Sequence, residues 1–88
     1  FFDNYNAIYV SESSMKETQY LNEIPPIMLE RQLSIRAFDS YNMMVDANIC
    51  DGRDARNLIE QLFKNEAVSY LQAHFAKRGC FAANIYRC

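Results

Sequence analysis

The sequence predicts an all-α fold, an antiparallel helical hairpin formed by residues 27–47 and 53–77. Only two Gly and two Pro occur in the 88 residues, too few turn residues for a many-stranded sandwich or barrel. Apolar side chains recur at spacings of three and four along both segments, which is the pattern of an amphipathic helix. A short turn over residues 48–52 would let the two helices pack against each other.

Before the hairpin, we expect an extended arm and a short helix. Residues 1–13 mix aromatic residues with Asn and show no helical period, so this arm is predicted to be extended. Ser14 and Glu17 form a capping-box pattern, which predicts a short helix over residues 15–22. The Pro pair that follows prevents this helix from continuing.

The first long helix is predicted to begin at about residue 27, because Pro26 is well tolerated in a first helical turn. Its apolar stripe comprises Leu29, Leu33, Ala37, Tyr41, Met44 and Val45. Ile35 and Phe38 lie beside this stripe and widen the apolar face beyond what one neighbouring helix covers. We therefore expect this face to contact something besides the second helix.

The second long helix is predicted to follow Asp51, whose carboxylate suits a helix N-terminus. Its apolar positions are Ala55, Leu58, Ile59, Leu62, Phe63, Ala67, Tyr70, Leu71, His74 and Phe75. Lys77 and Arg78 suit the negative end of a helix. Gly79 suits the left-handed position just after it, so the helix is expected to end there.

We expect one domain over residues 1–88, consisting of the arm (1–13), a helical body (14–78) and a short tail (79–88). A chain of this length builds one core at most. Because two helices leave apolar surface uncovered, we expect the cover to be a second copy in a homodimer or a larger protein complex. The residues predicted to bind the partner are Ile35, Phe38, Tyr41, Tyr70 and Phe75.

The sequence shows no recognisable catalytic or metal-binding arrangement. His74 is the only His, so a His-pair zinc site and a Ser–His–Asp relay cannot be assembled in the usual way. The segment that begins at Asp46 resembles a calcium loop, but Cys50 stands where Asp or Asn is needed and Asp51 where Gly is needed. Two glycines also cannot build a glycine-rich phosphate loop. We therefore expect a non-enzymatic protein without a metal or a cofactor.

Charge and hydropathy narrow the class of partner. Eleven acidic residues against nine basic ones give a formal charge of -2 and a pI near 5.2, so no basic field attracts nucleic acid. No apolar run approaches the roughly 20 residues of a transmembrane helix. The expected partner is a protein.

The three cysteines leave two compartments open. Their odd number and the lack of Cys-x-x-Cys spacing favour a reducing, intracellular or organellar location. Cys50, at the turn of the predicted hairpin, lies far from the other two, so the only internal disulfide within reach is Cys80–Cys88. Such a bridge would instead indicate a small secreted effector or inhibitor that binds its target through a bridged C-terminal loop.

The segment from Met28 to Phe38 resembles the start of the phycobilisome-degradation family, which has Leu-Glu, an apolar residue, Leu/Ile-Arg and Phe at this spacing. The matching residues are Leu29, Glu30, Leu33, Ile35, Arg36 and Phe38. Downstream, the apolar residues that look like the family's second helix are Ala55, Leu58, Ile59, Leu62 and Phe63. A second likeness, to phycobilisome linker domains, is carried by the segments 35–37 and 75–77.

Members of the first family are helical hairpins that dimerise into four-helix bundles and act as adaptors between phycobiliproteins and a Clp-type chaperone. The resemblance implies a helical adaptor or accessory subunit that docks on a larger complex, a photosynthetic antenna such as the phycobilisome. Its partners would be phycobiliproteins or other photosynthetic subunits. A plastid location, in the stroma or on the thylakoid surface, is implied as well.

Overall fold

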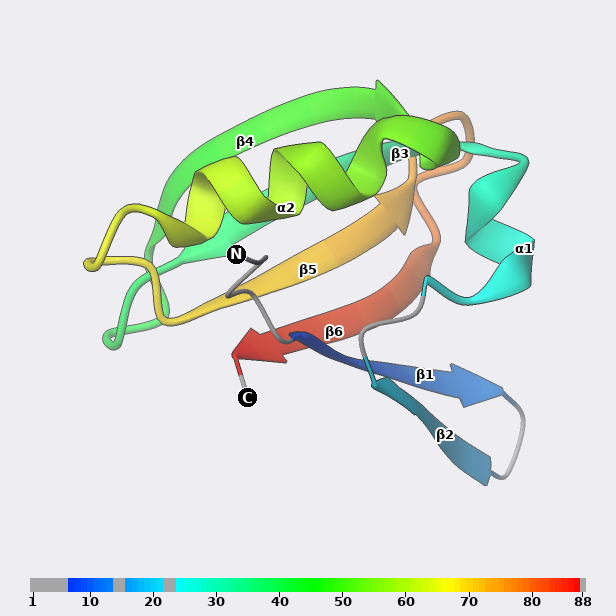
Figure 1. Ribbon diagram of the computed structural model, residues 1–88, viewed down its shortest axis with the longest axis horizontal. Helices are drawn as coiled ribbons and strands as arrows, with labels where there is room; N and C mark the ends of the chain where they lie inside the picture. Colours follow the sequence, from blue (N-terminus) through cyan, green and yellow to red (C-terminus); the bar gives the residue numbers. More distant parts are fainter. Residues whose placement is uncertain (1–6, 14–15, 22–23, 88) are drawn as a thin grey trace, which may run out of the picture.

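The predicted all-α hairpin is wrong, because the computed structural model is dominated by an antiparallel β-sheet (Figure 1). It describes residues 7–13, 16–21 and 24–87. The strands are β1 (Ala7–Ser13), β2 (Lys16–Leu21), β3 (Gln32–Phe38), β4 (Met44–Asp51), β5 (Tyr70–Phe75) and β6 (Phe81–Arg87). The helical segments are α1 (Pro26–Leu29), the 3-10 turn η1 (Gly52–Asp54) and α2 (Ala55–Phe63). Neither described α-helix has the length and apolar character needed to cross a membrane.

The six strands form one sheet in the order β2-β1-β6-β5-β3-β4, and every neighbouring pair is antiparallel. Three hairpins build it, namely β1–β2, β3–β4 and β5–β6. The segment that contains α2 connects β4 to β5 and crosses β3, because β3 lies between those strands in the sheet. Pairing of β6 with β1 joins the N-terminal hairpin to the rest, and α2 lies across one face (Figure 1).

The first predicted helix, over residues 27–47, is largely a strand hairpin. In β3, Leu33 and Ile35 are fully buried, whereas Ser34 and Arg36 are half-buried. This is the two-residue period of a strand. Leu33 and Ala37 also fit a helical stripe, because residues four apart share a face in a helix and in a strand alike. That shared spacing explains why the helical prediction was wrong here.

The second predicted helix, over residues 53–77, is correct only in its first part. The buried residues of α2 are Ala55, Ile59, Leu62 and Phe63. After α2, the amide of Val68 donates to the carbonyl oxygen of Asn65 (3.0 Å), and Asn65 Oδ1 accepts the amide of Ala67 (3.0 Å). This turn ends the helical course, and Leu71 and Ala73 are then buried at strand spacing in β5.

The predicted arm, short helix and tail contain strands where the structure describes them. β1 lies in the arm 1–13, whose residues 1–6 are outside the described part of the chain. The predicted helix 15–22 is replaced by β2, and its residues 15 and 22 are also outside. The tail 79–88 contains β6, which pairs with β1 on one side and with β5 on the other. This segment is therefore an interior strand of the sheet.

The core lies between α2 and one face of the sheet. The buried sheet residues on this side are Ala7, Tyr9, Leu33, Ile35, Ala37, Leu71, Ala73, Ala83 and Ile85. They form one cluster with the buried residues of α2 and with Met28 and Val68. Burying each large apolar side chain contributes about 1.5–3 kcal/mol, so this face supplies most of the driving force for folding.

The short helix α1 is held close to the start of η1 by Gly52. A Cβ at this position would lie 1.8 Å from the carbonyl oxygen of Met28, so only glycine fits. The amide of Gly52 donates to the carbonyl oxygen of Arg31 (2.8 Å). This contact fixes the place where β3 begins.

Arg87 holds the end of α2 against β6. Its guanidinium donates to the carbonyl oxygens of Val68, Phe63 (2.8 Å) and Asn65 (3.1 Å), and lies 4.6 Å from the centroid of the Phe63 ring. The last carbonyl groups of a helix have no partner within the helix. The end of the predicted tail therefore serves as a cap for the helix.

Candidate functional site

The face of the sheet opposite α2 has the features of a recognition surface. The register places on it Ile8, Val10, Ser34, Arg36, Phe38, Tyr70, Gln72, His74, Asn84 and Tyr86. All of these residues are half-buried or exposed, and none is fully buried. The buried residues of both described α-helices belong to the core on the other side. We call this surface the open face.

An apolar row crosses five strands of the open face at one end. It is formed by Met44, Phe38, Tyr70, Tyr86 and Ile8, which are cross-strand neighbours in this order. The rings of Phe38 and Tyr70 are stacked at 5.1 Å and 13°, and those of Tyr70 and Tyr86 are tilted at 6.3 Å. Aromatic pairs at such distances contribute about 0.5–1.5 kcal/mol beyond the area they bury. We call these five residues the aromatic row.

The β3–β4 turn is firmly built and is tied to the aromatic row. Asp39 Oδ1 accepts the amides of Tyr41 (2.8 Å) and Met43 (3.0 Å), and the amide of Asn42 donates to the Asp39 carbonyl oxygen (3.1 Å). Asn42 has a φ of 63°, a conformation that Asn tolerates better than most residues. Its Oδ1 accepts the hydroxyl of Tyr70 (3.1 Å). The turn therefore presents Tyr41 from a fixed backbone.

Exposed apolar side chains concentrate on this turn and on β4. Nine large apolar side chains are exposed among the described residues, and five of them lie within residues 41–49. These five are Tyr41 (83% exposed), Met43 (63%), Met44 (53%), Val45 (46%) and Ile49 (62%). We call them the docking edge. It is continuous with the aromatic row, because Met44 belongs to both.

β4 is also an edge strand with backbone groups that face outward. The amide of Ala47 donates to the carboxylate of the neighbouring Asp46 (2.8 Å) and so points away from β3. In an antiparallel ladder the direction of these groups alternates along the strand. Ile49 and Asp51 therefore also direct backbone groups outward. An edge of this kind can accept a strand from another protein.

The segment that carries the docking edge is negatively charged. Residues 39–51 contain Asp39, Asp46 and Asp51 and no Lys or Arg. Asp46 and Asp51 are exposed, and Asp39 is half-buried. A contact surface that combines apolar and basic side chains would complement this region.

The structure brings together three of the five residues predicted to bind a partner. Phe38 and Tyr70 are stacked, and Tyr41 lies in the turn beside them. Ile35 is 0% exposed in the core, so it offers no surface to a partner. Phe75 lies at the other end of β5, where the Arg31 guanidinium is 5.2 Å from its ring centroid.

Sequence reasoning did not single out Tyr86, Met43 or Ile49 as contact residues. The sequence places Tyr86 in the predicted tail and Ile49 in the predicted turn. A usable signal was present in the turn, because Asp39 and Asn42 are typical residues of a hairpin connection. The apolar residues that flank this turn on both sides would then have been placed on one sheet.

The possible Cys80–Cys88 bridge has one end outside the described residues, so it stays a prediction. Cys80 is free and exposed, and Cys88 lies outside the described residues.

The Cys50 thiol and the groups that could ligate a metal are the other chemical features of the described part. Burial, with the nearby carboxylates of Asp54 and Asp51, raises the pKa of the Cys50 thiol, which keeps it in the less nucleophilic thiol form. Among the described residues, no three His, Cys, Asp or Glu side chains gather where a metal ion could be held.

Comparison with known proteins corrects the resemblance to phycobilisome proteins. The segment 28–38 that carries it ends α1 and forms β3, so it does not form the helix that the resemblance implied. No curated protein and no solved structure matches the chain significantly. One protein-family model matches residues 1–87, and it is described as "Protein of unknown function (DUF1203)". The chain therefore belongs to the DUF1203 family.

Proposed function

We propose that the chain is a non-enzymatic protein-binding module that docks through the docking edge and the adjoining aromatic row. The observation that carries this proposal is the gathering of five exposed large apolar side chains within residues 41–49. Exposed apolar patches on a small domain mark interaction surfaces, and Tyr and Met are enriched in such contacts. Because the backbone of the turn is fixed by Asp39, little loop ordering is left to oppose binding.

The partner is a protein segment that carries apolar and basic side chains. The three Asp residues of segment 39–51 have no Lys or Arg among them, so basic residues on the partner would be attracted to this region. A second copy of the chain would bring the same acidic strip to the contact. The outward backbone groups of Ile49 and Asp51 suit an extended segment that adds a strand to β4.

Selection from a displayed library of random peptides of about twelve residues, a length that spans a strand, tests this proposal. We expect the enriched peptides to alternate apolar residues with Lys or Arg. The double variant Tyr41→Ser/Ile49→Thr should weaken their binding at least about tenfold, which is about 1.4 kcal/mol. Ile27→Ser is the matched control, because Ile27 is 55% exposed on α1, outside the docking edge.

Three outcomes would contradict the proposal. The library could give no enriched peptide, the enriched peptides could be acidic, or Ile27→Ser could weaken binding as much as the double variant. A sedimentation-velocity experiment could give a fourth contradicting outcome. A dimer of the parent chain that the double variant abolishes would show that a second copy occupies the docking edge.

A further inference from the structure

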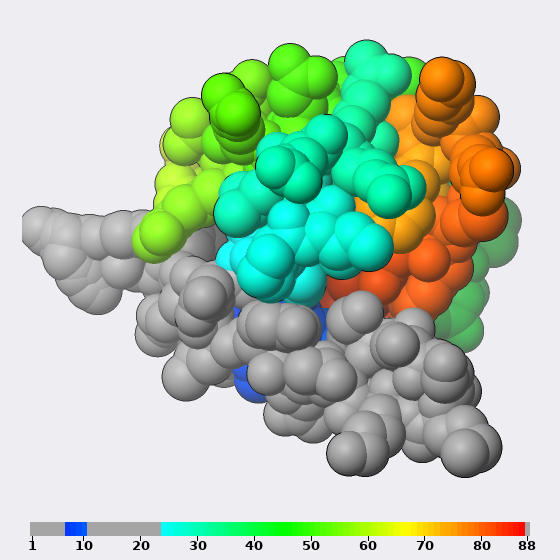
Figure 2. Space-filling view, turned by 90° about the vertical axis from the view of Figure 1, so that its right-hand side faces the viewer, coloured from blue at the N-terminus to red at the C-terminus, as the bar shows by residue number. Residues whose placement is uncertain are grey.

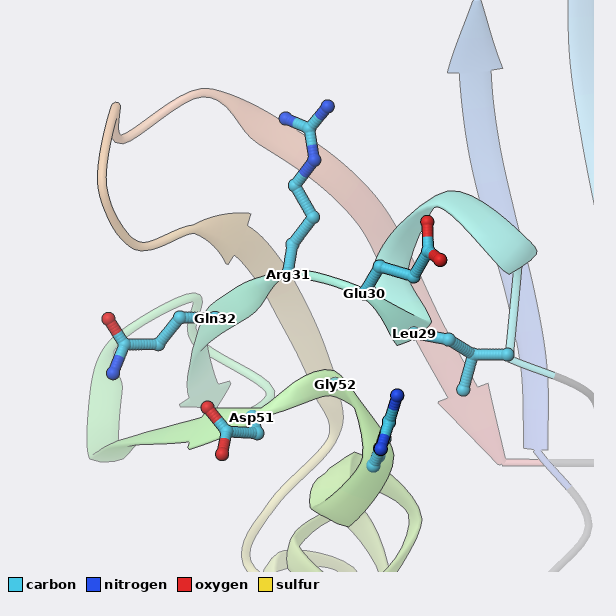
Figure 3. Close-up of a pocket in the computed structure, with 7 residues that line it drawn as sticks. Leu29, Glu30, Arg31, Gln32, Asp51 and Gly52 are labelled. Carbon is cyan, nitrogen blue, oxygen red and sulfur yellow. The ribbon is translucent and has the colours of Figure 1, made fainter.

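A second surface lies at the opposite end of β3 and β5 from the docking edge. There, a hollow of about 570 Å³ is lined by Glu30, Arg31, Gln32, Phe75, Lys77 and Arg78. Figure 2 shows the segment that follows α1, in cyan, beside the β5–β6 turn, in orange. A neighbouring hollow of about 320 Å³ shares Arg31 and is bordered by Asp51 and Gly52 (Figure 3). We call Arg31, Lys77 and Arg78 the basic corner.

Backbone hydrogen bonds hold the two segments of the basic corner in place. The amide of Ala76 donates to the carbonyl oxygen of Gln32 (2.9 Å), which ties the β5–β6 turn to the start of β3. Within the turn, the amide of Gly79 donates to the Phe75 carbonyl oxygen (2.7 Å). Gly79 has a φ of 79°, which glycine adopts without strain. The side chains of Arg31, Lys77 and Arg78 therefore extend from backbone segments that are held in place by hydrogen bonds.

The charge of the basic corner is not compensated locally. In the described part of the chain, the side chains of Arg31, Lys77 and Arg78 form no hydrogen bond or ion pair with another described residue. Glu30 is the one carboxylate among the residues that line the larger hollow. Three cations around one hollow repel one another, and a bound anion would relieve this repulsion. The arrangement contrasts with the net charge of -2 for the whole chain.

Arg31 is oriented for an oxyanion. Its guanidinium lies over the ring of Phe75, 5.2 Å from the centroid, so the ring contacts the guanidinium and restricts its motion. The N–H groups at the edge of a stacked guanidinium remain available, and they match phosphate and carboxylate oxygens in pairs. Figure 3 shows the Arg31 side chain extending away from Asp51.

We propose that the basic corner binds the phosphoryl group of a small phosphate monoester, with the organic part of the ligand beside Phe75. The three cations and the carboxylate of Glu30 give the lining of the hollow a net charge of about +2, which matches the charge of a phosphate dianion. The volume of the hollow is within the range of small-molecule sites, about 300–1,000 Å³. A long polyanion is disfavoured, because its remaining charges would meet an acidic chain. This site is separate from the docking edge and does not depend on it.

Titration of the ¹⁵N-labelled chain with phenyl phosphate, followed by NMR, tests the proposal. We expect saturable shifts of the amides of Arg31 and Gln32 and of residues 76–79. The double variant Lys77→Gln/Arg78→Gln should raise the Kd at least about tenfold, the change expected for a loss of about 1.4 kcal/mol. Arg36→Gln/Lys64→Gln removes the same charge elsewhere and should leave the Kd within about twofold.

Two further ligands distinguish the sources of a phosphoryl group. Inorganic phosphate should bind the same amides more weakly than phenyl phosphate, because it makes no contact with Phe75. A single-stranded oligonucleotide should bind more weakly per site than phenyl phosphate. The proposal is overturned by shifts that do not saturate, by shifts confined to other residues, by tighter binding of the oligonucleotide, or by an equal loss in the control. Arg78→Gln alone serves as the second variant if the double variant melts early.

Discussion

The two faces of the sheet are built from the same strands, yet they differ in nearly every physical respect. On the covered face, Leu33, Leu71 and Ile85 are each 0% exposed beneath α2. On the open face, their neighbours in sequence are half-buried or exposed, and they include stacked aromatic rings. Because folding is driven by apolar surface removed from water, the covered face supplies stability. The open face buries less apolar surface and contributes less to stability.

Adjacent residues of β5 give the largest expected contrast. Leu71→Ala on the covered face should destabilise the chain by about 2–5 kcal/mol, because it leaves a cavity in the core. Gln72→Ala on the open face should change the free energy of unfolding by less than about 1 kcal/mol. Urea denaturation of both variants measures the difference. Equal effects of the two substitutions would show that the two faces do not divide stability in this way.

Tyr9 gives the covered face a pH dependence at alkaline pH. Burial of the phenol is the main cause that raises its pKa from 10.0 to about 12, with a smaller contribution from Glu60 against an opposing one from Arg56. The folded state thus favours the neutral phenol. The stability associated with this group is complete below about pH 10 and is lost as pH rises towards about 12, about 3 kcal/mol in all.

Thermal unfolding midpoints between these pH values measure this effect. Tyr9→Phe should remove the part of the pH dependence that Tyr9 contributes, and its curve should be flatter than that of the parent chain. Identical curves for the two chains would show that the phenol of Tyr9 does not titrate differently in the folded and unfolded states.

The smallest expected effect belongs to the open face. The hydrogen bond from the Tyr70 hydroxyl to Asn42 Oδ1 is exposed, so it should contribute only about 0.5–1 kcal/mol. A double-mutant cycle with Tyr70→Phe and Asn42→Gly measures the coupling, and Gly preserves the positive φ of position 42. Additive effects of the two substitutions would show that the turn is not tied to the aromatic row.

The helical prediction was correct where the spacing is specific to a helix. Ala55, Leu58, Ile59 and Leu62 recur at spacings of three and four, and a spacing of three places residues on one face in a helix but on opposite faces in a strand. Leu29, Leu33 and Ala37 are spaced four apart, and this spacing fits the period of a helix and the two-residue period of a strand alike. In β4, buried and exposed residues do not alternate, because every residue of this edge strand except Cys50 is exposed.

Three of the predicted contact residues lie on the proposed surface, although the argument that selected them was wrong. Phe38 widens the apolar face of the first predicted helix, Tyr41 belongs to the apolar stripe of that helix, and Tyr70 belongs to the apolar positions of the second predicted helix. They come together because Phe38 and Tyr70 are paired across β3 and β5. Ile35 was chosen by the same argument but is buried, because a strand turns neighbouring odd and even positions to opposite faces.

The sequence by itself determined the net charge, the acidic residues of segment 39–51 and the helical period of residues 55–63, because composition, charge and short-range spacing are local properties. Only the tertiary structure decided that β6 lies inside the sheet, that Tyr86 extends the aromatic row and that Arg31 meets the β5–β6 turn. These contacts join residues far apart in the chain. Strand pairing depends on which segments meet in space, and no local period of the sequence encodes that choice.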